Sequence, residues 1–255
     1  MSSASQESAP HPSNAEASAQ DKQDKPVNVA DLRVSYERSD LLEQTVNPNP
    51  ILQFQSWFQD AIAAEVLEPN AMTLATVSEG QPSARIVLLK DFDERGFVFY
   101  SNFQSRKGQE LSHNSLAALV FWWGPLERQV RIEGRIVQVS GAEADAYFQS
   151  RPRGSQLGAW ASDQSKVIDG RAALEQRLQD LEQTYKNRSI PRPDHWGGFR
   201  LQPHTFEFWQ GRPNRLHDRL CYRQNTVQNP PSQTAQDPVS QSQEAQTWKI
   251  ERLSP

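Results

Sequence analysis

The sequence predicts a mainly β protein with flanking helices, an α+β fold built around an antiparallel barrel. Two observations predict this fold class. Strand-like segments follow one another as hairpins and are interrupted by only a few helical segments, an order that favours antiparallel pairing over a parallel sheet. The chain also contains neither a glycine-rich dinucleotide-binding fingerprint nor a phosphate-binding P-loop, so a nucleotide-like ligand must be held in some other way.

The composition of the chain argues against several classes of function. A formal net charge of −4 over 255 residues argues against a nucleic-acid-binding protein, which usually carries a basic excess. The single cysteine, Cys221, cannot form an internal disulfide, and the five histidines lack zinc-like spacing, so no metal site is predicted. No apolar run reaches the length of a membrane span, and the first residues do not resemble a signal or transit peptide. A cytoplasmic protein is therefore expected.

Two low-complexity segments divide the chain. Residues 1–28 are rich in Ser, Ala, Gln and Pro and predict a disordered N-terminal tail. Residues 29–255 predict one folded domain, which contains a second Gln- and Pro-rich segment at 224–246. This segment lies between strand-like stretches, so we expect a flexible insertion that leaves the barrel intact.

The first half of the domain predicts one helix followed by strands. Apolar residues recur at helical spacing in 49–67. Residues 71–78 and 83–90 predict two strands around a turn containing Gly and Pro. The turn at 93–96 then leads into a strand at 97–102.

The second half alternates hairpins with helices. Residues 115–123 and 126–140 predict another hairpin. Ser140, followed three residues later by Glu143, is a capping-box signature for a helix. Residues 169–187 predict an amphipathic helix. The predicted closing strands are 199–211, 214–223 and 248–253.

Cationic residues gather at the ends of two predicted elements. Arg85 and Lys90 bracket an apolar strand, a pattern that also fits a core strand with charged ends reaching water. Ser105 is a candidate N-cap, and Arg106 and Lys107 follow it in the first helical turn, where cations oppose the helix dipole. A bound phosphate would reverse the sign of that interaction. The alternative is an exposed short helix with poorly placed cations.

A second phosphate site is indicated further along the chain. Four residues separate Tyr147 from Arg151 and again Arg151 from Ser155. Together the three side chains offer hydroxyl and guanidinium donors. Gln164 and Ser165 follow a short turn and add polar donors, whereas the alternative is a set of surface residues at a helix end.

The last constellation lies after Trp209. If 214–223 is a strand, Arg215, His217 and Arg219 share one face. Two cations about 7 Å apart repel by about 2 kcal/mol at an effective dielectric near 20, so an anion is expected over them. Taken together, two phosphate sites and several ring-sized apolar surfaces suggest two phosphorylated heterocycles that meet face to face.

At this point several motifs resemble those of the pyridoxamine 5′-phosphate oxidase family. They are RIVLLK, FYSN, SRK, LERQV, SRPRGSQLGAW, WGGFRLQP, FEFWQG, RLHDR and WKIERLSP. The resemblance covers about residues 30–223 and 247–255. It implies an FMN-binding split β-barrel that works as a homodimer, with each active site built from both subunits. It further implies oxidation of pyridoxamine or pyridoxine 5′-phosphate to pyridoxal 5′-phosphate, with oxygen as acceptor and hydrogen peroxide as product.

The resemblance also implies roles for individual residues. Positions that match FMN contacts are Arg85, Ile86, Val87, Leu88, Leu89, Lys90, Tyr100, Ser101, Arg106, Lys107, Gln129, Gln164, Ser165, Trp209 and Arg219. Positions that match the substrate-phosphate site are Lys90, Tyr147, Arg151 and Ser155. Arg215, Leu216 and His217 match residues over the substrate ring, and Arg215 and His217 are the implied catalytic pair.

Some alternatives stay open at this level. Val34 and Ser35 separate Arg33 from Tyr36 where the family often has a basic pair before Tyr, so the sequence does not decide whether these residues form a lid. A flavin reductase that uses NAD(P)H would share the barrel. A non-catalytic protein that stores FMN or pyridoxal phosphate would share the binding residues.

Overall fold

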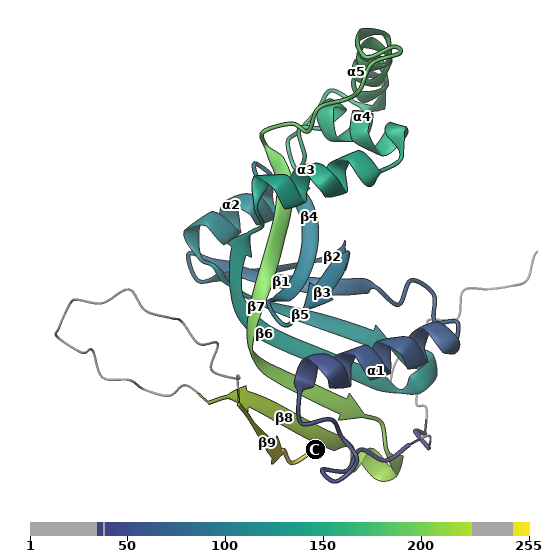
Figure 1. The fold of residues 1–255 in the computed structure, drawn as a ribbon, viewed down its shortest axis with the longest axis vertical. Helices are drawn as coiled ribbons and strands as arrows, with labels where there is room; N and C mark the ends of the chain where they lie inside the picture. The colour runs from purple at the N-terminus through teal and green to yellow at the C-terminus, as the bar shows by residue number, and fades with distance from the viewer. Residues whose placement is uncertain (1–34, 38, 226–246) are drawn as a thin grey trace, which may run out of the picture. The chain divides into compact units, whose positions relative to one another are not determined.

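The computed structural model describes residues 35–37, 39–225 and 247–255. The predicted tail 1–28 and all but the first two residues of the 224–246 segment lie outside the described residues, so both remain predictions. The elements, in chain order, are α1 (Pro50–Ala63), β1 (Ala71–Ser78), β2 (Gln81–Leu88), β3 (Asp91–Asp93), β4 (Gly96–Asn102), α2 (Arg106–His113), β5 (Leu116–Trp123), β6 (Arg128–Gln138), α3 (Gly141–Ser150), α4 (Arg153–Ala161), α5 (Arg171–Thr184), β7 (Trp196–Gln210), β8 (Asp218–Gln224) and β9 (Trp248–Arg252) (Figure 1).

The strands form one antiparallel sheet, as the hairpin order predicted. Its order is β2-β1-β5-β6-β7-β4-β3, and β8 pairs with both β7 and β9. The backbone N–H of Lys90 donates to the carbonyl of Val98 (2.9 Å), which ties the chain just after β2 to β4. Because β2 begins the path and β4 lies near its other end, this contact brings the sheet round into a barrel.

Strand β7 connects the two parts of the sheet. It pairs with β6 along most of its length, while its other edge pairs first with β4, through Leu201, and then with β8, from Thr205 onward. The register between β6 and β7 shifts at this change of partner, since Glu133 pairs with Thr205 and Gly134 with Pro203, so His204 is an extra residue on β7. At Gly134 a Cβ atom would lie 2.2 Å from the carbonyl oxygen of Gln202, so only glycine permits the close approach of the two strands.

Helix α1 packs its apolar stripe into the barrel. Asn49 caps it by accepting from the backbone N–H groups of the first turn, and Pro50 fits the first helical position, which needs no N–H donor. Phe54 is fully buried, and its ring contacts aromatic rings from three other parts of the chain, including those of Phe97 and Phe121 (4.9 and 5.0 Å between centroids). The predicted helix at 49–67 is therefore confirmed, with its end at Ala63.

Helices α3, α4 and α5 form a second, smaller core where β7 begins (Figure 1). Phe148, Leu157 and Trp196 are buried there, and half-buried Leu178 and Leu181 of α5 pack against them. The Ser140 hydroxyl accepts from the Glu143 backbone N–H, which confirms the predicted N-cap of α3. Helix α4 begins directly after Pro152, because a proline with extended backbone fits immediately before a helix.

The predicted strand at 214–223 is wrong in its first half. A 3₁₀ turn occupies Pro213–Arg215, and β8 begins only at Asp218. Asn214 and Arg215 have φ values of 58° and 62°, which no strand residue adopts. Pro213 fixes the start of this turn, and asparagine tolerates the left-handed conformation that follows. Arg215 and His217 therefore lie in the β7–β8 connection and do not share a strand face with Arg219.

Gly96 gives a test of the β3–β4 hairpin. Its φ is +124°, and a Cβ atom there would lie 1.9 Å from the carbonyl oxygen of Leu201 on β7. We expect Gly96→Ala to lower the free energy of unfolding by about 3 kcal/mol or more, since backbone strain and overpacking add. Urea denaturation measures the change. The control is Gly141→Ala, where no atom lies within 4 Å and a change within about 0.5 kcal/mol is expected. Equal stability of the two variants would contradict this account.

Candidate active site

A cavity of about 440 Å³ opens between the barrel and the helices α2, α3 and α4. This volume lies in the range of small-molecule sites. Residues from β2, β4, α2, α3 and α4 contribute to its wall, so the cavity exists only where the barrel meets the helical core. The residues that line it are Ile86, Val87, Leu88, Lys90, Tyr100, Ser101, Asn102, Lys107, Tyr147, Arg151, Ser155, Gly158, Ala159, Ser162, Gln164 and Trp196.

Most of this wall was predicted from the sequence. Residues of both predicted phosphate sites line this one cavity: Lys90 and Lys107 of the first site, and Tyr147, Arg151 and Ser155 of the second. Sequence reasoning missed Asn102, Gly158, Ala159, Ser162 and Trp196. For Trp196 a signal existed, because it begins WGGFRLQP, one of the motifs that carry the family resemblance.

Three aromatic rings stack on one side of the cavity. The rings of Tyr100 and Tyr147 lie 3.9 Å apart between centroids at 16°, and Trp196 stacks on Tyr100 at 5.4 Å. Burial raises the pKa of Tyr100 to about 12 and also raises the pKa of Tyr147. Both hydroxyls therefore stay protonated at neutral pH and can donate hydrogen bonds.

Arg151 is the group in this cavity that most clearly calls for an anion. Its guanidinium lies 4.6 Å above the ring of Trp196, and burial lowers its pKa. One of its nitrogens, Nη1, is buried and has no hydrogen-bond partner among the described residues. An unsatisfied buried donor on a cation is costly, and a bound phosphate oxygen would satisfy it.

Lys107 provides the second cationic point. Its ammonium donates to Ser101 Oγ (3.0 Å) and to Gln164 Oε1 (3.2 Å), both neutral acceptors. Burial, and then the nearby Arg85, lower the pKa of Lys107. An anion at this position would restore the charge stabilisation that burial removes.

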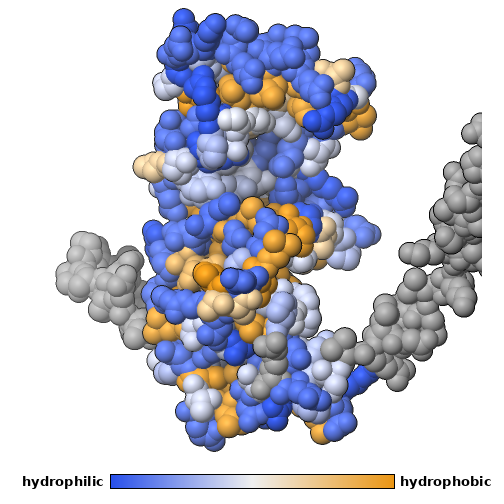
Figure 2. Space-filling view, turned by 90° about the vertical axis from the view of Figure 1, so that its right-hand side faces the viewer, coloured by the Kyte–Doolittle hydropathy of each residue, from blue (hydrophilic) through white to orange (hydrophobic). Residues whose placement is uncertain are grey.

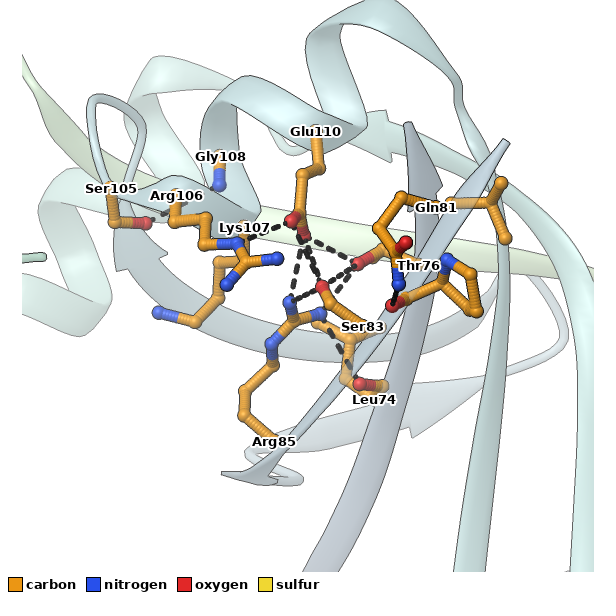
Figure 3. Close-up of polar contacts among 12 residues, drawn as sticks. Leu74, Thr76, Gln81, Ser83, Arg85, Ser105, Arg106, Lys107, Gly108 and Glu110 are labelled. Carbon is orange, nitrogen blue, oxygen red and sulfur yellow. Dashed lines mark hydrogen bonds and ion pairs between the residues drawn. The ribbon is translucent and has the colours of Figure 1, made fainter. Parts of the chain in front are cut away.

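Arg85 and Arg106 lie beside this point but outside the cavity wall. Both guanidinium groups pair with the carboxylate of Glu110, at 2.7 and 2.8 Å (Figure 3). Leu89 is buried in the barrel core, and Ser165 lines a separate cavity of about 90 Å³. The implied FMN roles of these four residues stay predictions.

The remaining predicted residues form a separate group, here called the C-terminal cluster and defined as Gln129, Trp209, His217 and Arg219. Gln129 and Trp209 are paired across β6 and β7, and Trp209 and Arg219 across β7 and β8. The imidazole of His217 lies 4.6 Å from the Trp209 ring, and its Nδ1 accepts from the Arg212 backbone N–H (3.1 Å). Burial, and then Arg215, lower the pKa of His217, so a neutral imidazole is favoured.

The loop beside this cluster is exposed. Leu216 is 69% exposed and Arg215 is exposed as well. The ring of Tyr36 packs on both Trp209 and His217, at 5.8 Å from each centroid. Tyr36 thus covers the C-terminal cluster, whereas Arg33 lies outside the described residues and their proposed lid role remains untested.

The cavity and the C-terminal cluster lie at opposite ends of β7. Trp196 lines the cavity at the start of this strand and Trp209 belongs to the cluster near its end. At about 3.3 Å per residue the two positions are separated by roughly 40 Å along the strand. None of the cluster residues lines the cavity of the same chain.

No group of three or more His, Cys, Asp and Glu side chains that could hold a metal ion occurs in 35–37, 39–225 and 247–255. Within the same residues no helix combines the length and the apolar character needed to cross a membrane.

Two family models match the chain. Residues 58–185 match the model described as pyridoxamine 5′-phosphate oxidase. Residues 196–255 match the model described as the pyridoxine 5′-phosphate oxidase C-terminal dimerisation region. The first match contains the residues that supply most of the cavity wall, and the second contains β7, β8 and β9.

Comparison with individual proteins agrees with the two family matches. A pyridoxine/pyridoxamine 5′-phosphate oxidase of Acaryochloris marina is 61% identical over 229 residues, which are 89% of this chain and 96% of that protein. One of a Cyanothece species is 59% identical, over 90% of this chain and 99% of that protein. Among solved structures, PhzG from Burkholderia lata in complex with tetrahydrophenazine-1-carboxylic acid superposes with a TM-score of 0.74 at 29% identity, over 86% of this chain and 100% of that chain.

Proposed function

The chain belongs to the pyridoxamine 5′-phosphate oxidase family, and on that basis we propose that it oxidises pyridoxamine and pyridoxine 5′-phosphate to pyridoxal 5′-phosphate. FMN is the proposed cofactor, oxygen the acceptor and hydrogen peroxide the second product. The observation that carries the proposal is one cavity lined by two cationic points, Lys107 and Arg151, and by the stacked rings of Tyr100, Tyr147 and Trp196. Two phosphorylated rings that meet face to face fit a cavity with two such points.

The residues present fit FMN. Lys107 would meet the cofactor phosphate, because its ammonium is partly desolvated and its two acceptors are neutral. Ile86, Val87 and Leu88 offer an apolar strand surface for a flat ring system, and Gln164 and Ser101 offer hydrogen-bonding groups. When bound, FMN supplies the acceptor for the hydride that leaves the substrate carbon and passes the electrons on to oxygen.

The substrate phosphate is assigned to the other cationic point. Arg151 Nη1 has a hydrogen bond to give, and the Tyr147 and Ser155 hydroxyls line the same cavity, as does the ammonium of Lys90. These groups fix one end of the substrate and orient its reacting carbon.

The C-terminal cluster would serve the cavity of a second copy of the chain. It lies far along β7 from the cavity, and the region that contains it matches a dimerisation model. Figure 2 shows hydrophobic residues gathered across the middle of one face, and exposed large apolar side chains include Ile86, Leu116 and Trp122. Burial of such side chains favours association. A homodimer with shared active sites, already implied by the sequence resemblance, accounts for both observations.

In that assembly Arg215 and His217 hold the amine or hydroxyl end of the substrate. Burial and the neighbouring Arg215 favour neutral His217, and its Nδ1 already accepts from Arg212, so its proton resides on Nε2. A neutral imidazole beside a guanidinium can orient the reacting group and help guide the loss of its proton.

The direct test uses the full chain reconstituted with FMN. We expect a yellow protein that releases hydrogen peroxide when given pyridoxine 5′-phosphate under air. Failure to bind FMN would overturn the proposal. Tight FMN binding without peroxide would indicate a carrier, and peroxide that requires NAD(P)H would indicate a flavin reductase.

Arg151→Ala tests the substrate-phosphate assignment. We expect the KM for pyridoxine 5′-phosphate to rise about tenfold or more with kcat little changed, because a charge-assisted phosphate contact exists before and during reaction. The control is Arg153→Ala, since Arg153 is exposed and donates to backbone carbonyls at Tyr185 and Arg188 outside the cavity. Unchanged KM with reduced kcat would remove Arg151 from the phosphate site.

Mixed dimers test the shared site. Arg151→Ala and Arg215→Ala homodimers are mixed, allowed to exchange subunits, and assayed at low substrate concentration. If each site combines the Arg151 of one copy with the Arg215 of the other, every hybrid dimer keeps one intact site. About a quarter of wild-type activity should then return in an equal mixture, since half of the dimers are hybrids. No recovery despite verified exchange would assign both residues to one subunit's site.

A further inference from the structure

Glu110 holds the most densely bonded carboxylate in the neighbourhood of the cavity. It lies on α2, is only 8% exposed, and accepts hydrogen bonds from side chains on β1, β2 and α2 (Figure 3). Its Oε2 accepts from Thr76 (2.6 Å), Ser83 (2.8 Å) and Arg85 (2.7 Å), and its Oε1 accepts from Ser83 (2.9 Å) and Arg106 (2.8 Å). Both oxygens are therefore fully engaged.

This bonding pattern suits an anchor and excludes an acid–base role. Hydrogen bonds from the Thr76 and Ser83 hydroxyls, and then from the two arginines, outweigh burial and lower the pKa of Glu110 to about 2. The group therefore stays charged at every pH at which the protein would work. None of the lone-pair directions needed to take up a proton is left open.

The anchor fixes the direction of two guanidinium groups. Arg85 donates from Nη2 to Glu110 and from Nη1 to the Thr76 hydroxyl (2.6 Å) and the Leu74 carbonyl (3.3 Å), so both of its terminal nitrogens are held. Arg106 uses Nε for Glu110, which leaves its terminal nitrogens for another partner. Without the carboxylate, both long side chains would regain rotamer freedom.

Charge balance gives a second reason to connect Glu110 with a phosphate. Arg85, Arg106 and Lys107 contribute three positive charges and Glu110 one negative charge, which leaves two net positive charges. A phosphate monoester carries nearly two negative charges at neutral pH. The same group lies at the start of α2, where Ser105 caps the helix and unpaired backbone N–H groups favour an anion.

We propose that Glu110 is a positioning residue for the cofactor-phosphate site. It holds the charge of Arg85 in place beside that site and orients Arg106, whose terminal nitrogens are left for another partner, toward the phosphate that Lys107 meets at the start of α2. The inference rests on the proposed function, because FMN supplies that phosphate. Glu110 itself does not touch the ligand and acts only through the two arginines.

Whether Glu110→Gln weakens or tightens FMN binding distinguishes a positioning role from simple electrostatics. A negative charge near a phosphate disfavours binding, so electrostatics alone predicts that Glu110→Gln tightens FMN binding. Positioning predicts the opposite, because the two guanidinium groups lose their anchor. Riboflavin lacks the phosphate, so a positioning role leaves its affinity unchanged, whereas a general loss of structure weakens both flavins alike.

The experiment measures Kd for FMN and for riboflavin on the full-length apoprotein by quenching of flavin fluorescence. We expect Glu110→Gln to weaken FMN about tenfold while riboflavin changes less than about twofold. The control is Asp60→Asn, which removes a carboxylate that pairs with Arg128 away from the cavity and should change neither Kd. If Glu110→Gln does not fold, Glu110→Asp keeps the charge, shortens the reach, and should shift the FMN-to-riboflavin ratio in the same direction.

The outcomes are distinguishable from those of the proposed function. A wild-type protein that binds neither flavin would overturn the proposed function and this inference with it. A wild-type protein that prefers FMN, with the preference unchanged or strengthened in Glu110→Gln, would overturn this inference alone. Equal weakening of both flavins would also overturn it and assign Glu110 a structural role.

Discussion

The site depends on one constraint, the change of partner along β7. A strand has two edges, and β7 gives one of them to β6 while the other passes from β4 to β8. Pro203 lies at the change and has no N–H to donate, so a break in pairing costs little there. The first half of β7 presents Trp196 to the cavity and the second half presents Trp209 to the C-terminal cluster. A single strand thus carries both groups of predicted site residues but keeps them apart, so in the proposed homodimer a second copy of the chain would join them.

The cations that line the cavity are only partly buried. Its cations are desolvated enough to lower the pKa of Lys107 and Arg151, yet each is held by neutral groups or by an aromatic face. Fully buried charges without partners would destabilise the fold, whereas fully solvated ones would bind phosphate weakly. Arg85 and Arg106, beside the cavity, instead pair with Glu110, which neutralises part of their charge and fixes their direction.

Local sequence rules were sufficient where one residue sets the conformation. The N-caps at Ser105 and Ser140 and the helical face of α1 followed from side-chain chemistry within a few residues. The same rules failed between Pro213 and His217, where alternation of charge suggested a strand and the proline with its following asparagine formed a turn. They also missed α4, because its capping residue is a proline and offers no side-chain hydrogen bond.

The sequence alone determined the antiparallel class, the family, and the residue types that gather at the two cationic points, since these depend on periodicity, composition and motifs along the chain. Only the tertiary structure decided which of those residues share a cavity. It joined Lys107 to Arg151, separated Trp209 and His217 from both, and engaged Arg85 and Arg106 with Glu110. The physical reason is that side chains from distant elements meet through sheet register and helix packing, and neither is encoded in any short stretch of sequence.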